Sequence, residues 1–260
     1  MKKLFALLAV VLAVVSCQKD ADLDVNVGGE QLVNITVALP EETRAASGTG
    51  FDLTTLEANG LELRYILEIY AKDNTEDCIR KEAYTNVTSN VVFPVRLIHG
   101  RDYRVVAWAD IVEKGTQADR YYYTQEGLDN VVIKDNGTVN WNAMDETRDA
   151  FTTFADIEDF SANRSLDLTL VRPFAKIRVV STDIKDIEDL GFELGHGKVE
   201  YHYAMYRKFN AYTGIAFDAK PKTHEEFSYP TPYTGDYENE TQRTLFADYI
   251  LGYILKILVG

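Results

Sequence analysis

The sequence is poor in cysteine, histidine and positive charge, and each shortage argues against a class of function. There are two cysteines, Cys17 and Cys78, and four histidines in 260 residues. A zinc site usually needs three or four well-placed ligands, so we expect no metal centre. The 27 basic residues are outnumbered by 41 acidic ones, which gives a net charge of −14. Such an acidic chain repels a phosphate backbone, and we expect no nucleic-acid partner.

At its N-terminus the chain lacks an apolar run long enough to span a membrane. Residues 4–15 are all apolar, but a spanning helix needs roughly 20 such residues. Lys2 and Lys3 precede this run and the small Ser16 follows it, which is typical of a secretory signal. Residues 14–17 have the sequence VVSC, which is typical of a lipobox. We therefore predict a signal peptide over residues 1–16 and a lipoprotein that carries palmitate-type acyl chains on Cys17.

The segment behind Cys17 is polar and acidic. Loss of the signal removes Lys2 and Lys3 and changes the net charge from −14 to −16. We expect residues 17–30 to form a flexible tether, because a polar acidic segment buries too little apolar surface to fold. Lys19 and Asp20 resemble the export tag of lipoproteins that Bacteroidota place on the outer face of the outer membrane. The expected location is therefore the outer membrane, at the cell surface, with the lipid anchor as the membrane contact.

Motifs that carry catalytic chemistry are missing. The sequence has no glycine-rich phosphate loop, no Gly-x-Ser-x-Gly elbow and no His-Glu-x-x-His motif. Cys78 lies in no recognisable nucleophile signature, and we expect it to be a structural thiol. We predict that the protein is not an enzyme and uses no cofactor.

Two groups of side chains match metal ligands by residue type alone. His196, Glu200 and His202 would share one face of a strand, but no further ligand lies near them in the sequence. The acidic residues within 156–159 lack the glycine turn of a calcium loop. We expect solvated side chains at both places.

Short runs of alternating or β-branched apolar residues predict strands through most of the chain. These runs cover residues 32–39, 61–71, 90–98, 103–112, 121–124, 131–134, 165–170 and 176–181. Helical periodicity is confined to residues 53–59 and 183–190, one or two turns each. Many strands with few helices predict an all-β fold, and the chain length favours two tandem β-sandwich domains of the immunoglobulin or transthyretin type.

The strand pattern within residues 103–110 also predicts which side chains share a face. Val105 and Ala107 should lie on the face opposite to Trp108, and Trp108 should be buried, because a large aromatic in a strand usually packs in a core. Asn136 and Gly137 lie between two apolar runs and predict a hairpin turn, since both tolerate positive φ.

Proline chemistry suggests where the two domains meet. Pro173 lies between two strand-like runs, and a proline suits a strand start or a link because it cannot donate to a ladder. We predict an N-terminal sandwich over residues 31–172 and a C-terminal one over residues 173–260. Residues 220–242 are expected to form a long surface loop. The apolar run 249–260 is either a central strand or the end of a shortened domain.

One loop near the N-terminus stands out as a place for proteolysis. Residues 41–50 have the sequence EETRAASGTG, which is small and polar, and follow directly on the strand-like run 32–39. Arg44 is the single basic residue of this loop. Either it is an ordinary solvated arginine, or it marks a cleavage site between Arg44 and Ala45.

These features together resemble one known family. A lipobox, a first strand, a Thr-Arg-Ala loop and paired sandwiches are similar to the fimbrillin-like proteins of type V pili in Bacteroidota. The stretches YRVVAWAD (103–110), LVRPFAKI (170–177) and FNAYTG (209–214) resemble one branch of that group that has no assigned function.

The resemblance implies a fimbrial subunit or accessory lipoprotein whose partners are other pilus subunits. In such pilins an arginine-specific protease releases the first strand, and a strand from a neighbouring subunit fills the groove by β-strand addition. A monomeric lipid-anchored adhesin, binding a host protein or a glycan through aromatic loop residues 229–237, is the alternative. The donor strand of this chain cannot be identified from its sequence.

Overall fold

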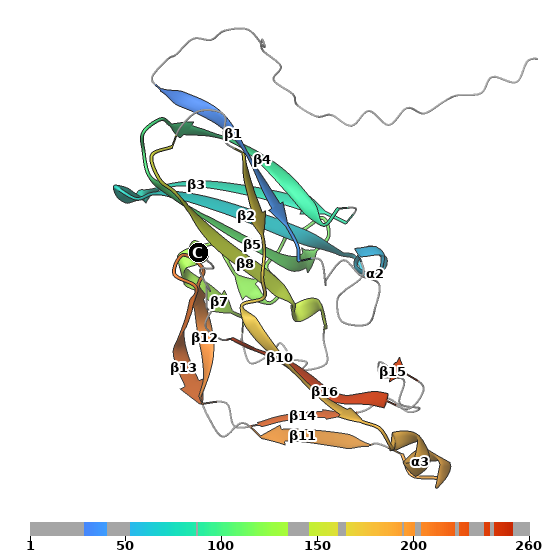
Figure 1. Ribbon diagram of the computed structural model, residues 1–260. Coiled ribbons are helices and arrows are strands. Elements are labelled where there is room, and N and C mark those ends of the chain that lie inside the picture. Colours follow the sequence, from blue (N-terminus) through green and yellow to red (C-terminus); the bar gives the residue numbers. More distant parts are fainter. Residues whose placement is uncertain are drawn as a thin grey trace, which may run out of the picture.

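The fold is seen in a computed structural model. It describes residues 29–40, 53–86, 88–134, 146–160, 165–193, 195–200, 204–221, 224–228, 237–239 and 242–251. These residues form antiparallel sheets with one parallel strand pair, and the predicted all-β sandwich class is confirmed (Figure 1). Neither helix in this part of the chain has the length and apolar content needed to cross a bilayer.

The N-terminal half is a sandwich of two sheets. The first sheet has the order β4 (Asn90–Ile98), β1 (Glu30–Ala38), β9 (Leu166–Thr169). The central sheet has the order β3 (Asn74–Thr85), β2 (Leu61–Ala71), β5 (Tyr103–Glu113), β8 (Ala150–Ile157). Alternate side chains of the two sheets meet in one continuous apolar core, as expected for a face-to-face pair.

The inner strands of the central sheet, β2 and β5, are almost entirely buried, because other parts of the chain cover both of their faces. Val105, Ala107 and Ala109 pack into the core shared with the first sheet. Val106 and Trp108 point the other way, into a second core that includes Phe174 and Tyr249 of the C-terminal half. Trp108 is fully buried, so its predicted burial and facing are confirmed.

The remaining strands form three smaller sheets. The third sheet has the order β13 (Ile215–Pro221), β12 (Ala204–Asn210), β7 (Val131–Ile133), β6 (Tyr122–Tyr123). The C-terminal sheet has the order β10 (Phe174–Ser181), β16 (Gln242–Leu251), β15 (Tyr237–Asn239), and β11 (His196–Glu200) pairs with β14 (His224–Ser228). Because β7 pairs with β12, the third sheet joins strands from both sides of Pro173. The domain boundary placed at residue 172 stays a prediction.

Short helical turns complete the described chain. They are α2 (Leu53–Ala58), α3 (Ile184–Asp189) and the 3₁₀ turns η1 (Leu128–Asn130) and η2 (Glu146–Arg148). Both α-helices lie where helical periodicity predicted them. The long loop predicted over residues 220–242 is wrong in part, because β14 and β15 lie within it. The hairpin turn predicted at Asn136 and Gly137 lies outside the described residues.

Candidate functional site

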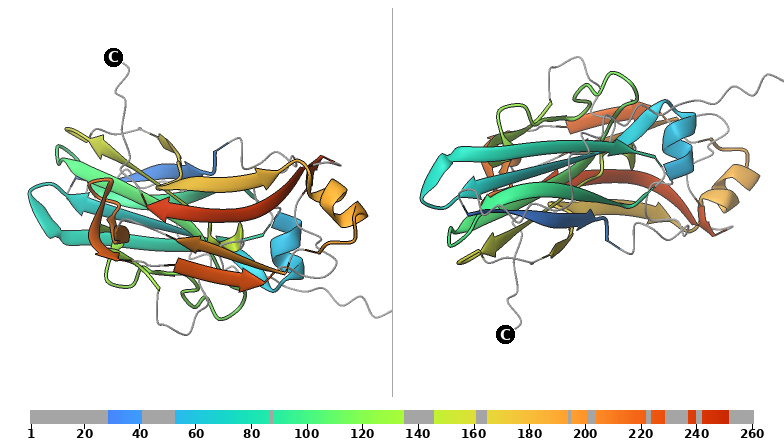
Figure 2. Two further views of the ribbon diagram at one scale, coloured as in Figure 1. Left: turned by 90° about the horizontal axis from the view of Figure 1, so that it is seen from below. Right: turned by 90° about the horizontal axis from the view of Figure 1, so that it is seen from above.

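The first strand, β1, is the middle strand of the first sheet. It pairs antiparallel with β4 from Glu30 opposite Ile98 to Ala38 opposite Asn90. On its other side it pairs parallel with β9 over four residues, beginning with Ile35 opposite Leu166. Figure 2 shows β1, in blue, lying alongside β4. A strand in this position has both of its edges hydrogen-bonded, so its loss would open two ladders at once.

The inward face of β1 supplies a continuous apolar row to the sandwich. Val33, Ile35, Val37 and, just beyond the strand, Leu39 are each at most 3% exposed, while Leu32 and Asn34 face outward. Burying an aliphatic side chain of this size stabilises the fold by about 1.5–3 kcal/mol. The row therefore contributes a large part of what holds the first sheet on the central one.

Backbone hydrogen bonds fix both ends of β1. The His99 N–H donates to the Gly29 carbonyl at 2.8 Å, and the Leu39 N–H donates to the Ser89 carbonyl at 2.9 Å. The Leu170 N–H donates to the Ala38 carbonyl at 2.9 Å, which extends the contact with the β9 side. The chain from residue 41 to 52 lies outside the described residues, and so do Arg44, Ala45 and the predicted lipidation site Cys17.

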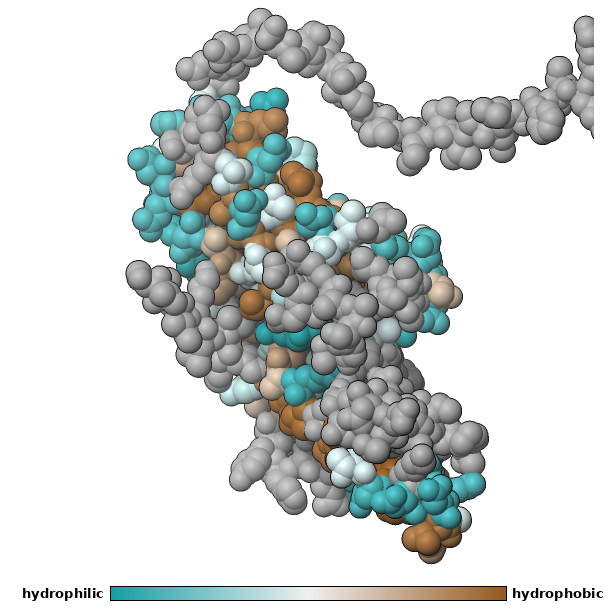
Figure 3. All heavy atoms as spheres, turned by 45° about the vertical axis from the view of Figure 1, so that its right-hand side comes forward, coloured by the Kyte–Doolittle hydropathy of each residue, from teal (hydrophilic) through white to brown (hydrophobic). Residues whose placement is uncertain are grey.

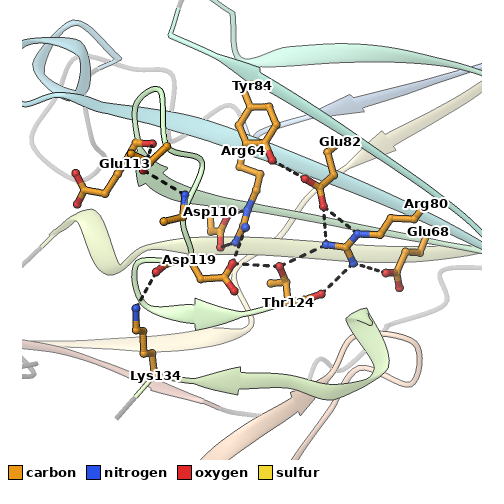
Figure 4. A network of polar contacts seen from close by, with 12 residues as sticks. Arg64, Glu68, Arg80, Glu82, Tyr84, Asp110, Glu113, Asp119, Thr124 and Lys134 are labelled. Atoms are coloured by element: carbon orange, nitrogen blue, oxygen red, sulfur yellow. Dashed lines mark hydrogen bonds and ion pairs between the residues drawn. The ribbon is translucent and has the colours of Figure 1, made fainter. Parts of the chain in front are cut away.

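Behind the central sheet, opposite to β1, a buried ionic network begins at Arg64 (Figure 4). The Arg64 guanidinium donates to both oxygens of Asp110, at 2.9 and 2.6 Å, and to Asp119 at 2.6 Å. Burial alone would lower the pKa of Arg64, but the two carboxylates outweigh it and raise that pKa. Arg64 therefore stays charged inside the protein and holds β2 to β5 and to the loop that follows β5.

A second part of the network centres on Glu68 (Figure 4). Its carboxylate accepts hydrogen bonds from Tyr70, from Arg80 and, at 2.8 Å, from the Leu128 N–H. Arg80 also donates to the Thr124 carbonyl at 2.9 Å. Burial, together with the Glu68 carboxylate, raises the pKa of Tyr70. These contacts fix the segment between β5 and β7 against the face of the central sheet that carries Arg64 and Glu68.

Two further polar residues of β3, Glu82 and Tyr84, lie beside Arg80. Both Nε and Nη2 of Arg80 donate to Glu82, at 2.9 and 2.7 Å. Burial, followed by the Glu82 carboxylate, raises the pKa of Tyr84 to about 12. The Arg80 guanidinium is thus paired with Glu68 of β2 and with Glu82 of β3.

A separate buried ion pair holds the last described strand. Arg148 of η2 and Asp248 of β16 are both fully buried, and their charged atoms lie 2.9 Å apart. Next to them, Arg172 pairs with Asp149 at 2.8 Å. β16 is the middle strand of its sheet, and its residues Tyr249 and Leu251 are buried. For these residues, the prediction of a central strand at the start of the run 249–260 agrees with the structure. Residues 252–260 lie outside the described part of the chain.

The remaining side chains singled out in the sequence are dispersed. Cys78 is an exposed residue of β3, but its thiol is partly shielded from solvent, and this desolvation, followed by the charge of Glu68, raises the pKa of the thiol to about 11. Asp156 pairs with Arg104 at 2.7 Å, and this hydrogen bond lowers its pKa. His196 is the first residue of β11 and Glu200 is the last, while His202 lies outside the described residues. Within the described residues, no group of three or more ligands could hold a metal ion.

The comparisons with known proteins give one family and several distant structures. No curated protein matches the sequence. A candidate adhesin from Bacteroides thetaiotaomicron is 12% identical, with a TM-score of 0.44 over 90% of this chain and 74% of its own. A candidate adhesin from Bacteroides ovatus is 12% identical, with a TM-score of 0.43 over 86% of this chain and 68% of its own.

The fimbrial anchor protein Mfa2 from Porphyromonas gingivalis is 10% identical, with a TM-score of 0.37 over 87% of this chain and 74% of its own. At these TM-scores the structural likenesses carry no argument about function. The model of a family of unknown function matches residues 25–252, which is most of the sequence. The chain therefore belongs to the family of unknown function DUF6562.

Proposed function

We propose that the protein is a lipid-anchored, fimbria-associated surface protein that assembles by strand addition after cleavage at Arg44. The observation that carries the proposal is the place of β1, which is the first described strand and yet the middle strand of its sheet. The resemblance of the sequence to fimbrillin-like proteins supports the same function.

Cleavage behind β1 would change what holds that strand. In the intact chain β1 is joined to the domain through residues 39–52, so a β1 that separates returns to the same site. A cut after Arg44 removes this connection and leaves only the ladders and the apolar row described above. When β1 then departs, the unpaired edges of β4 and β9 and an apolar groove are exposed, and such edges take up another strand.

The groove defines the strand that could replace β1. The replacement needs apolar side chains at four alternate positions, to stand where Val33, Ile35, Val37 and Leu39 were. It also needs a length close to the nine residues of β1, to satisfy the β4 ladder. Within the run 249–259, Tyr249 and Leu251 already belong to the second core of their own chain, which argues against them as donor residues.

The test is a cleavage experiment on the purified full chain in detergent. An arginine-specific protease should cut after Arg44, and the product should form oligomers that resist denaturing detergent without boiling. The matched control is Arg44→Ala, which should be neither cut at this loop nor assembled. If the wild type is cut cleanly and stays monomeric at high concentration, the assembly function is wrong, and the monomeric adhesin that binds a host protein or a glycan takes its place.

A further inference from the structure

The end of the molecule at α3 carries exposed apolar side chains. Ile187, Leu190 and Phe192 are 39%, 76% and 65% exposed, and we call these three residues the apolar knuckle. α3 lies at one extremity of the molecule in each ribbon view (Figures 1 and 2), and an apolar cluster next to hydrophilic side chains is visible at this end (Figure 3). Exposed apolar clusters with a polar rim are typical of protein contacts.

The rim of the knuckle is acidic. Asp186, Asp189 and Glu193 are exposed within the same short segment. Anionic lipid headgroups would repel such a rim, so a membrane is a poor partner for this surface. A complementary surface would combine apolar side chains with positive charge.

The outer face of the third sheet has this complementary composition. Tyr123, Val132, Lys208 and Phe217 lie directly opposite one another on four adjacent strands, and therefore form one row on one face. The other face of the same sheet buries Val131 and Phe209 in the second core, so the row faces outward.

Two lysines and a further apolar residue complete this outer face. The Lys134 Nζ lies 5.3 Å from the centre of the Tyr123 ring, and the Lys208 Nζ lies 5.8 Å from the centre of the Phe217 ring. Tyr123 is 43% exposed and Ile215 is 45% exposed. We call Tyr123, Val132, Lys134, Lys208, Ile215 and Phe217 the lysine–aromatic face.

We infer that the apolar knuckle of one copy docks on the lysine–aromatic face of a second copy of this chain. The two surfaces are complementary in both charge and apolar character, and they belong to different elements, α3 and the third sheet. Contact between two different patches is heterologous, so a docked pair keeps one free knuckle and one free face, and the contact repeats from copy to copy.

The contact is weak, because it is small. Stable complexes bury about 800 Å² per partner, and a knuckle of three apolar side chains covers less. A dissociation constant on the order of 100 μM is expected, weakening as salt screens the charges. Copies held on one membrane meet at high effective concentration, and there such a contact is populated.

The first experiment measures self-association of the full Arg44→Ala chain in detergent. This background prevents the proposed cleavage, so the result does not depend on strand exchange. Two samples labelled at the exposed Cys78 with donor and acceptor dyes are mixed, and energy transfer is followed against concentration and salt. We expect transfer that rises with concentration, falls with salt and is lost in Leu190→Ser/Phe192→Ser. Transfer that is absent, or equal in this variant, overturns the inference.

The second experiment exchanges the charges. Asp186→Lys/Asp189→Lys places positive charge on the knuckle, and Lys134→Glu/Lys208→Glu places negative charge on the face. Each variant alone should lose energy transfer, while an equal mixture of the two should recover it. A mixture that does not recover it contradicts the proposed pairing, provided that both variants melt like the parent chain. If the face variant is unstable, the exposed Ile215→Glu serves in its place. It also places negative charge on the face, so it should lose energy transfer alone and recover it with the knuckle variant.

Discussion

Trp108 is the largest of the side chains through which the central sheet contacts the third sheet. Its ring centre lies 5.5 Å from that of Tyr122 on β6 and 6.3 Å from that of Phe209 on β12. Trp108→Ala should lower the free energy of unfolding by about 3–5 kcal/mol, because it leaves a large cavity between two sheets. Urea denaturation measures the change, with Trp108→Phe as the conservative control. A loss below about 1 kcal/mol would show that this contact is unimportant.

Arg64 illustrates how a buried charge depends on its partners. Removing it in Arg64→Met leaves the carboxylates of Asp110 and Asp119 without their main cation, and should destabilise the protein by about 3–5 kcal/mol. The double variant Arg64→Met/Asp110→Leu should recover part of this loss, since one uncompensated charge is removed as well. Denaturant unfolding of Arg64→Met, Asp110→Leu and the double variant gives the coupling. A loss in the double variant equal to the sum of the two single losses would contradict a direct interaction.

At the scale of single elements, the apolar strand patterns predicted β2 and β4 with their observed ends, and helical periodicity predicted the places of both short helices. The same reasoning missed β3, whose sequence NTEDCIRKEAYT is charged on an edge strand and shows little apolar alternation. The ionic network was not predictable either. Arg64 and Glu68 are charged residues within an otherwise apolar run, which indicates that they need polar partners. Those partners are distant in the sequence: Asp119 is 55 residues from Arg64, and Leu128 is 60 residues from Glu68. Only the folded chain brings them together.

The contribution of β1 to the sandwich can be tested with two adjacent positions. Ile35 is fully buried and Asn34 is exposed on the opposite face of the strand. Ile35→Asp would bury an unpaired carboxylate and should destabilise the protein by more than about 3 kcal/mol. Asn34→Asp, the matched control, should change stability by at most about 0.5 kcal/mol. Thermal and urea unfolding compare the two, and similar losses in both would show that β1 is not a core strand.

At the scale of the whole molecule, the proposed functions occupy opposite ends. The start of β1, which the predicted tether would join to the membrane, lies far from α3 (Figure 1). With the proposed lipid anchor at the β1 end, the apolar knuckle would point away from the membrane, where it could reach another copy. Strand addition would join subunits at the sandwich, while the knuckle would connect them at the far end, so the two contacts do not compete for one surface.

This orientation depends on the lipid anchor. Substitution of each of the two cysteines in turn tests whether the anchor is present. Cys17 completes the lipobox sequence VVSC, whereas Cys78 lies on β3 of the folded domain. Cys17→Ala should abolish incorporation of a fatty-acid analogue, because the acylated thiol is removed. The variant should also leave the membrane fraction, because the apolar run 4–15 is too short to span the bilayer by itself. Cys78→Ala should keep both the label and the membrane location, since its thiol takes no part in anchoring. Equal labelling of the Cys17→Ala variant and the wild type would show that the protein is held at the membrane in another way, and the assignment of the two ends would then have to be made afresh.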